Sequence, residues 1–213
     1  MFNDRKDAGR KLAEALKGYE ADRPIILALP RGGVPVGFEV AVALGADLDV
    51  LVVRKIGAPW NPEFGVGAIA KGVEVFDQES LGFLGLKPED LRPVIEREEL
   101  ELERRSKLYR GDNPFPDLAD RVVILVDDGL ATGVTTRAAI IAIKQMNPAR
   151  LVLAVPVGPP ETVASLRSLV DELICLETPS DFMAVGAFYL SFPQTSDEEV
   201  IELLERAKSK VKQ

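Results

Sequence analysis

Residues 122–146 contain the feature that most restricts how this chain can fold. Val122 to Val126 are five apolar, mostly β-branched residues without charge or alternation, which predicts a strand buried on both faces of a sheet. Two carboxylates, Asp127 and Asp128, follow this strand, and a short run rich in glycine and threonine comes next. A helix-like run, Thr136 to Met146, continues directly from it. The succession of strand, acidic turn and helix is typical of an α/β fold.

The glycine- and threonine-rich run has the composition of a phosphate-binding loop. Gly129 and Gly133 let the backbone approach an anion closely, and Thr132, Thr135 and Thr136 add hydroxyl donors. Free N–H groups and the positive end of the helix dipole face the same point. The acidic pair cannot bind phosphate itself, so we expect it to hold ribose hydroxyls or a hydrated magnesium ion.

The run Val123-Ile-Leu-Val-Asp-Asp-Gly-Leu-Ala-Thr-Gly133 resembles the signature of type I phosphoribosyltransferases: four apolar residues, two acids, three variable residues and Thr-Gly. The resemblance implies that the loop binds the 5′-phosphate of phosphoribosyl diphosphate, while Asp127 and Asp128 act in catalysis on the ribose diol and hold Mg²⁺ through water. The substrate-binding residues that it implies in the loop are Gly129, Leu130, Ala131, Thr132, Gly133, Val134 and Thr135. An acidic pair after a buried strand also occurs in phospho-acceptor domains and in other doubly wound domains, which is the alternative interpretation.

A second strand-loop-helix unit lies nearer the N-terminus. Ile25 to Leu29 predicts a buried strand and Gly37 to Leu44 a helix, with a basic, glycine-rich turn between them. In that turn Arg31 is a fixed cation, and Gly32 and Gly33 expose backbone N–H groups for a second anion; a plain tight turn is the alternative. The turn resembles the pyrophosphate loop of the same family, in a version close to bacterial purine-salvage members. The resemblance implies a catalytic Arg31 and substrate-binding glycines.

Two cations follow a third predicted strand, Asp49 to Val53. They are Arg54 and Lys55, and we expect them at the same edge as the two loops, because ligands of open parallel sheets bind at the carboxyl ends of strands. The resemblance implies that both meet the diphosphate. A surface pair of cations is the alternative.

Residues 57–118 are expected to form a lid and helical insertion within a single domain of residues 1–213. Val66 to Ala70 and Val73 to Phe76 predict two short strands, which resemble the mobile hairpin loop that closes over phosphoribosyl diphosphate and excludes water. Polar candidates in this lid are Asn61, Glu63 and Lys71. Trp60 is expected to pack the lid on the body of the protein, with stacking on a base as the alternative. The charged run Arg92 to Arg110 predicts an exposed helix, part of the insertion or of a dimer surface.

Residues 178–213 are expected to form a hood segment and a C-terminal helix. Phe182 and Met183 fall where purine-salvage relatives place an aromatic and an aliphatic residue against the base, so the resemblance implies that they bind it. Those relatives also carry an acid a few residues later, where this chain has Leu190. Packing in the core of the hood is the alternative for Phe182.

The remaining elements complete the expected fold. Arg150 to Val155 and Glu172 to Leu176 predict two more core strands, separated by a helix over Glu161 to Leu169. Strands and helices therefore alternate, which predicts an α/β fold with an open parallel sheet and helices on both faces, carrying the lid insertion and the small hood.

Composition restricts the possible chemistry. The chain has 213 residues and no histidine, which excludes Ser-His and Cys-His catalysis and imidazole metal ligands. Its net charge of −8 argues against broad electrostatic binding to nucleic acid or to an anionic membrane. No apolar run is long enough to span a membrane and no signal peptide is recognisable, so a cytoplasmic protein is expected.

The expected activity is magnesium-dependent transfer of the 5-phosphoribosyl group from phosphoribosyl diphosphate to a nitrogen base, a purine being favoured, with release of diphosphate. The expected partners are these two substrates and a second copy of the chain. A non-catalytic regulator that senses phosphoribosyl diphosphate is the alternative, although such relatives bind nucleic acid through a basic face that this acidic chain lacks. A generic nucleotide-binding domain would need a Gly-x-Gly-x-x-Gly turn or a Walker lysine, and neither is present.

Overall fold

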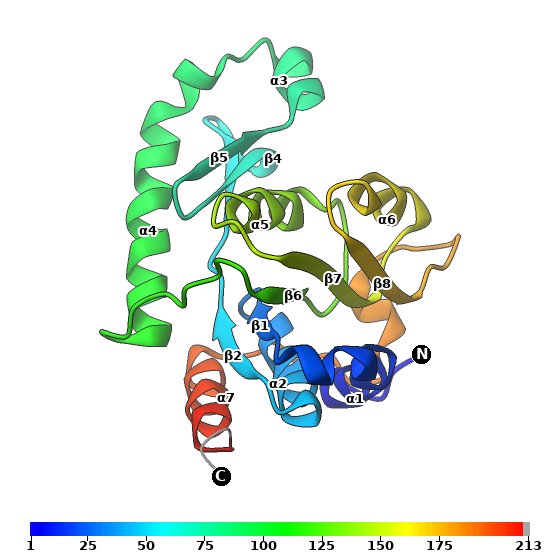
Figure 1. Cartoon of the computed structure of the whole chain (residues 1–213). Coiled ribbons are helices and arrows are strands. Elements are labelled where there is room, and N and C mark those ends of the chain that lie inside the picture. Colours follow the sequence, from blue (N-terminus) through cyan, green and yellow to red (C-terminus); the bar gives the residue numbers. More distant parts are fainter. Residues whose placement is uncertain (211–213) are drawn as a thin grey trace.

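The computed structural model describes residues 1–210 (Figure 1). The helices and strands are, in chain order, α1 (Arg5–Leu16), η1 (Lys17–Asp22), β1 (Ile25–Ala28), α2 (Gly33–Leu44), β2 (Asp47–Val50), β3 (Arg54–Ala58), β4 (Asn61–Ala70), β5 (Val73–Phe76), α3 (Gln78–Leu84), η2 (Pro88–Leu91), α4 (Arg92–Arg110), β6 (Val122–Val126), α5 (Val134–Lys144), β7 (Arg150–Val157), α6 (Pro160–Arg167), β8 (Glu172–Glu177), η3 (Val185–Phe188) and α7 (Asp197–Lys210). Residues 211–213, the end of the expected C-terminal segment, lie outside the described residues.

The central sheet is parallel, with strand order β2-β1-β6-β7-β8. Figure 1 shows α5 and α6 on one side of this sheet and α1 and α2 on the other. The predicted α/β fold, an open parallel sheet with helices on both faces, is therefore confirmed. Strands β1 and β6 are neighbours in register, with Ala28 opposite Val126, so the loops that follow them leave the sheet side by side.

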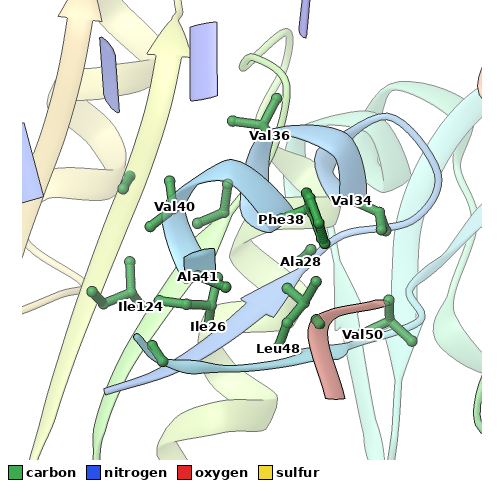
Figure 2. Close-up of a cluster of buried hydrophobic side chains, with 14 of the residues drawn as sticks. Ile26, Ala28, Val34, Val36, Phe38, Val40, Ala41, Leu48, Val50 and Ile124 are labelled. Carbon is green, nitrogen blue, oxygen red and sulfur yellow. The ribbon is translucent and has the colours of Figure 1, made fainter. Parts of the chain in front are cut away.

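Each face of the sheet belongs to its own apolar core, which is why the strands are continuous apolar runs rather than alternating ones. Ile26 and Ile124 pack with α1, α2 and α7 on one face, and Figure 2 shows this cluster around α2. Leu27 and Leu125 pack with α5 and α6 on the other. Burial on both faces makes the sheet a rigid platform for the loops at its carboxyl edge.

A second, antiparallel sheet of order β3-β4-β5 lies beside the central one. Its apolar side packs under α4, with Ile56, Ile69 and Ile95 in one buried cluster. The predicted strands at residues 66–70 and 73–76 are confirmed, and so is the predicted helix at residues 92–110. Strand β4 begins earlier than predicted, at Asn61, and its first half pairs with β3.

Three sequence predictions of local structure are wrong. The strand predicted at residues 49–53 is β2 at residues 47–50. The Leu51 N–H still donates to the carbonyl of Ala28 at 3.1 Å, but Val52 and Val53 are apolar because they pack against the cores. Helix α2 begins at Gly33 instead of Gly37, since the N–H of Gly33 already donates to the carbonyl of Leu29 at 3.0 Å. Trp60 lies at the β3–β4 turn and is 64% exposed, so it does not pack the insertion on the body.

No helix within residues 1–210 combines the length and the apolar character needed to cross a membrane.

Candidate functional site

The loop after β1 and the loop after β6 touch at the carboxyl edge of the central sheet. A Cβ atom on Gly32 would lie 1.9 Å from Oδ2 of Asp128. A Cβ atom on Gly33 would lie 2.9 Å from the carbonyl oxygen of Val126 and 3.1 Å from Oδ1 of Asp127. Only glycine allows so close an approach of backbone to an acidic pair. The structure therefore brings together the acidic turn and the arginine-glycine turn that were expected to share one site.

Gly33→Ala is expected to disrupt this contact. The new methyl group would meet backbone atoms of β6, which cannot rotate away, so we expect a loss of about 1–3 kcal/mol in the free energy of unfolding. Chemical denaturation of the two proteins measures the difference. Gly18→Ala is the matched control, because nothing lies within 4 Å of a Cβ atom there. Equal stability of both variants would contradict the close packing of the two loops.

The loop between β6 and α5 is held in place by its neighbours. The N–H of Leu130 donates to the carbonyl of Val157 at 2.8 Å, and the Thr162 hydroxyl donates to the carbonyl of Ala131 at 2.8 Å. Gly133 adopts a φ of 77° immediately before α5, a conformation that favours glycine. The first amides of α5 have no partner within the helix, and Thr132 is exposed beside them. The amides at the start of α5 and the Thr132 hydroxyl are therefore donors that an anion could use, and binding of phosphate here stays a prediction.

The two carboxylates of the acidic turn lie in different electrostatic surroundings. Oδ1 of Asp127 accepts the backbone N–H of Asp128 at 2.8 Å, and burial together with the neighbouring charge of Asp128 holds the pKa of Asp127 well above its usual range. Burial also raises the pKa of Asp128, but the Arg5 guanidinium opposes that rise. Nε of Arg5 donates to Oδ2 of Asp128 at 2.8 Å, and the two side chains are 11% and 16% exposed. Asp128 is thus paired with Arg5, whereas Asp127 makes no ion pair within residues 1–210.

Sequence reasoning missed Arg5, which connects the N-terminal helix with both the acidic turn and the hood. Its Nη1 donates to the carbonyl of Pro193 at 2.5 Å, and its guanidinium lies 3.7 Å from the ring centroid of Phe192. The Tyr189 hydroxyl donates to the backbone carbonyl of Asp128 at 2.6 Å. No local pattern marks Arg5, because its partner lies 123 positions away and only the packing of α1 brings the two together.

Arg31 belongs to the loop after β1, and its side chain extends toward α7. Its Nη1 is 3.7 Å from Oδ1 of Asp197, the first residue of α7. The same oxygen accepts the Tyr109 hydroxyl at 2.5 Å, which links this corner to α4. Arg31 also lines a cleft of about 250 Å³ with residues 194–198. The arginine is 28% exposed, so solvent reaches it and an anion at the edge could do so too.

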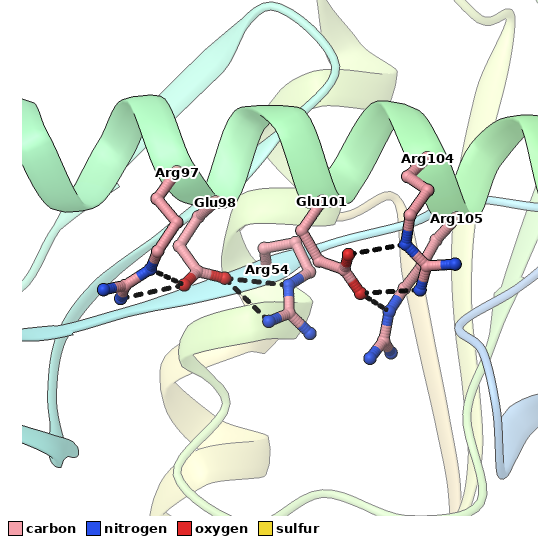
Figure 3. A network of polar contacts seen from close by, with 6 residues as sticks. All are labelled: Arg54, Arg97, Glu98, Glu101, Arg104 and Arg105. Carbon is pink, nitrogen blue, oxygen red and sulfur yellow. Dashed lines mark hydrogen bonds and ion pairs between the residues drawn. The ribbon is translucent and has the colours of Figure 1, made fainter.

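Arg54 and Lys55 are engaged elsewhere. They begin β3 of the small sheet and do not follow the end of a core strand, so the expected reason for placing them at the site is wrong. Nη2 of Arg54 lies 2.7 Å from Oε2 of Glu98, a buried residue of α4, and Figure 3 shows this pair beside the Glu98–Arg97 contact. Nζ of Lys55 donates to the carbonyl of Glu63 at 2.6 Å. A contact of either cation with diphosphate stays a prediction.

The hood residues expected at the base also have partners or are open to solvent. Phe182 stacks on Phe188, with ring centroids 5.5 Å apart and an interplanar angle of 12°, while Met183 is 90% exposed. Val185 lies closer to the acidic turn, since a Cβ atom on Gly129 would be 2.6 Å from its Cγ1. A role of Phe182 and Met183 in base binding stays a prediction, and Val185 is a further candidate that the sequence did not reveal.

The donor set limits how a metal ion could be held. Within the described residues, no three His, Cys, Asp or Glu side chains gather as a metal-binding group. Mg²⁺ commonly takes only one or two protein carboxylates, with the remaining oxygens from water and substrate phosphates. Asp127 and Asp128 fit such an ion, and the Arg5 contact engages only Oδ2 of Asp128. The residues present therefore suit a magnesium ion that arrives with a phosphorylated substrate.

A family model and a known relative both match most of the chain. Residues 3–192 match the family model described as "Phosphoribosyl transferase domain". A Mycobacterium tuberculosis protein, named provisionally as a phosphoribosyl transferase, is 44% identical over 208 residues, which is 97% of this chain and 47% of that protein. The chain thus spans about half the length of that relative.

Solved structures resemble the chain over nearly its whole length. The crystal structure of a Thermus thermophilus protein, TT1426, is similar with a TM-score of 0.82 and 43% identity, covering 96% of this chain and 98% of that one. A Neisseria gonorrhoeae protein crystallised with bound ppGpp has a TM-score of 0.50 and 13% identity, covering 97% and 98% of the two chains. At such low identity the second likeness shows the fold alone.

Proposed function

This chain belongs to the phosphoribosyltransferase family, and from that premise we propose that it transfers the 5-phosphoribosyl group of phosphoribosyl diphosphate to a nitrogen base and releases diphosphate. The observation that carries the proposal is the direct contact between the Gly32–Gly33 turn and the Asp127–Asp128 turn. A substrate with a phosphate at one end of a ribose and a diphosphate at the other needs two anion-binding loops with diol acceptors between them. These two loops offer that arrangement.

The β6–α5 loop would anchor the 5′-phosphate. Amides at the start of α5 and the hydroxyls of Thr132 and Thr135 are the donors, and the hydrogen bonds of Leu130 and Ala131 to neighbouring elements keep the loop from moving. A fixed phosphate fixes the sugar, and positioning of this kind supplies much of the rate of a transfer reaction.

The acidic turn would accept hydrogen bonds from the ribose diol. Departure of diphosphate leaves positive charge on the sugar ring, as in glycosyl transfer generally, and a nearby carboxylate stabilises that charge. The Arg5 guanidinium, whose Nε lies 2.8 Å from Oδ2 of Asp128, opposes the rise in the pKa of this carboxyl and so favours Asp128 as the acceptor for the diol hydroxyls. The raised pKa of Asp127 falls once a cation approaches it, which couples the charge of Asp127 to the arrival of substrate.

The leaving diphosphate would be bound by the backbone N–H of Gly32 and by Arg31. The expectation that Gly33 also exposes its N–H is wrong, because that group donates to the carbonyl of Leu29 at 3.0 Å. To reach the diphosphate, the Arg31 guanidinium exchanges its 3.7 Å contact with Asp197 for a phosphate oxygen. A bound magnesium ion would add neutralisation of the leaving group's negative charge. Together these groups would stabilise the negative charge that develops on the leaving diphosphate.

The test is release of diphosphate from phosphoribosyl diphosphate by the full chain with magnesium. A panel of bases should begin with purines, because the arginine-glycine turn resembles that of purine-salvage members, and continue with pyrimidines. We expect at least one base to give stoichiometric diphosphate and nucleotide, with Asp127→Asn/Asp128→Asn lowering the turnover by about 10²–10³-fold.

Binding of phosphoribosyl diphosphate without diphosphate release for any base would support the sensing regulator instead. Absence of any binding would contradict both functions. Isothermal titration of the full chain with phosphoribosyl diphosphate and magnesium separates these outcomes.

A further inference from the structure

A second cleft, of about 440 Å³, lies between the end of β2, the β4–β5 turn and α4. Its volume falls in the range of small-molecule sites, roughly 300–1,000 Å³. Much of its lining is apolar, from Val50 to Val52, Ala70, Leu102 and Phe115. The residues proposed to hold phosphoribosyl diphosphate do not line it, so it is separate from the site described above.

Arg110, the last residue of α4, brings a poorly compensated charge to this cleft. Its side chain is 14% exposed, and within the described chain Nε and Nη1 are buried without a hydrogen-bond partner. The Arg110 guanidinium lies 4.9 Å from the ring centroid of Phe115. Its nearest carboxylate is Asp49, with Oδ1 3.9 Å from Nε, too far for a hydrogen bond.

Asp49 is a weak counter-ion for this arginine. Burial raises the pKa of the Asp49 carboxyl, and its Oδ1 already accepts the N–H of Val50 at 2.7 Å. A buried guanidinium with so weak a counter-ion is unfavourable. An anion in the cleft would supply the negative charge and the hydrogen-bond acceptors that Arg110 lacks within the described chain.

The charged, exposed residues of the cleft lining restrict which anion it can bind. Glu99 and Glu103 stand one turn apart on α4 and are exposed, as is Lys71, whose Nζ lies 5.2 Å from the Phe115 ring centroid. The two carboxylates offset the charges of Lys71 and Arg110, so the lining suits a singly charged anion better than a phosphate dianion, and Glu99 and Glu103 attract an amine. The apolar lining and the Phe115 ring favour a hydrophobic body.

We propose that this cleft binds a small organic monocarboxylate with an apolar or aromatic body, its carboxylate paired with Arg110 and any amine directed to Glu99 and Glu103. A free aromatic amino acid and a simple aryl carboxylate share this chemistry. The cleft is independent of the transfer reaction, so binding persists in a variant that lacks the acidic pair.

The test uses four probes with the full chain in the absence of phosphoribosyl diphosphate: phenylalanine, phenylacetate, phenethylamine and inorganic phosphate. We expect the two carboxylates to bind in isothermal titration, phenylalanine more tightly because of its amine, and the other two to bind at least 10-fold more weakly. Equal binding of phenethylamine or phosphate would overturn the proposal, and so would absence of carboxylate binding at millimolar concentration.

Variants locate the site. Arg110→Met keeps the length of the side chain and removes the charge, so we expect at least 10-fold weaker binding of phenylacetate without loss of thermal stability. Lys107→Met is the matched control, since Lys107 is an exposed residue of the same helix outside the cleft lining. Ser106→Leu, which fills the cleft from its α4 wall, should weaken binding even if Arg110→Met folds poorly. Wild-type affinity in Ser106→Leu and in folded Arg110→Met would overturn the assignment.

Discussion

Asp127→Asn is expected to make the protein more stable and less active at the same time. Burial and the charge of Asp128 hold the pKa of Asp127 well above its usual range, so ionisation of this carboxyl at neutral pH opposes folding. Asparagine keeps the acceptor for the N–H of Asp128 and removes that opposition. Turnover should fall about 10²–10³-fold, since the carboxylate beside the sugar cation is lost.

The sign of the pH dependence follows from the same shift. A carboxyl whose pKa is raised in the folded state adds stability below its unfolded pKa, and this contribution is lost as pH rises through the folded value. The melting temperature of Asp127→Asn should therefore exceed that of the wild type most at pH 8, and the two should converge as pH falls toward 4. Asp112→Asn, at an exposed position, is the control and should change neither quantity. A melting temperature below the wild type at pH 8 would show that the ionised carboxylate stabilises the fold.

Arg5→Met is expected to weaken binding of phosphoribosyl diphosphate at neutral pH although Arg5 is proposed to touch no substrate. Removal of the guanidinium takes away the charge that opposes the rise in the pKa of Asp128, so this carboxyl should ionise only at higher pH. It also leaves a largely buried acceptor without its partner, which costs about 1–3 kcal/mol in the free energy of unfolding.

The informative measurement is the pH profile of the affinity for phosphoribosyl diphosphate. In Arg5→Met the profile should move to more alkaline pH, and Arg5→Lys should restore part of the shift. A purely structural role would lower stability without moving the profile. Arg10→Met is the matched control on the same helix, because Arg10 is 70% exposed and pairs only with Glu39 among the described residues. If the pH profile of this affinity does not move in a folded Arg5→Met protein, Arg5 does not position Asp128 for substrate binding.

The outline of the fold could be predicted from sequence because it depends on local patterns. Continuous apolar runs such as Val122–Val126 and Ile25–Leu29 alternate with helical runs, and that alternation leads to a parallel sheet with loops at one edge. Predictions failed where an apolar residue owed its character to packing rather than to pairing. Val52 and Val53 belong to that class, as they pack against apolar cores after the edge strand has ended.

The contact between the two loops could be predicted from the strand topology. The partners of the charged side chains at the site could not. Strands β1 and β6 were both recognisable, and ligands gather where parallel strands end, so the acidic and arginine-glycine turns were expected together. The partners of the charged groups were not recognisable. Arg54 pairs with Glu98 across the small sheet, and Arg31 lies near Asp197 of α7. Both of these ion pairs join side chains from elements far apart in sequence.

The amino-acid sequence alone determined the fold class, the acidic turn with its anion-binding loop and the family that they indicate, because each rests on neighbouring residues. Only the tertiary structure decided that Arg5 pairs with Asp128 and that, among the described residues, Asp127 makes no such pair. The same holds for the poorly compensated charge of Arg110 in the second cleft. Charge compensation and burial are properties of surroundings assembled from the whole chain, and no local pattern encodes them.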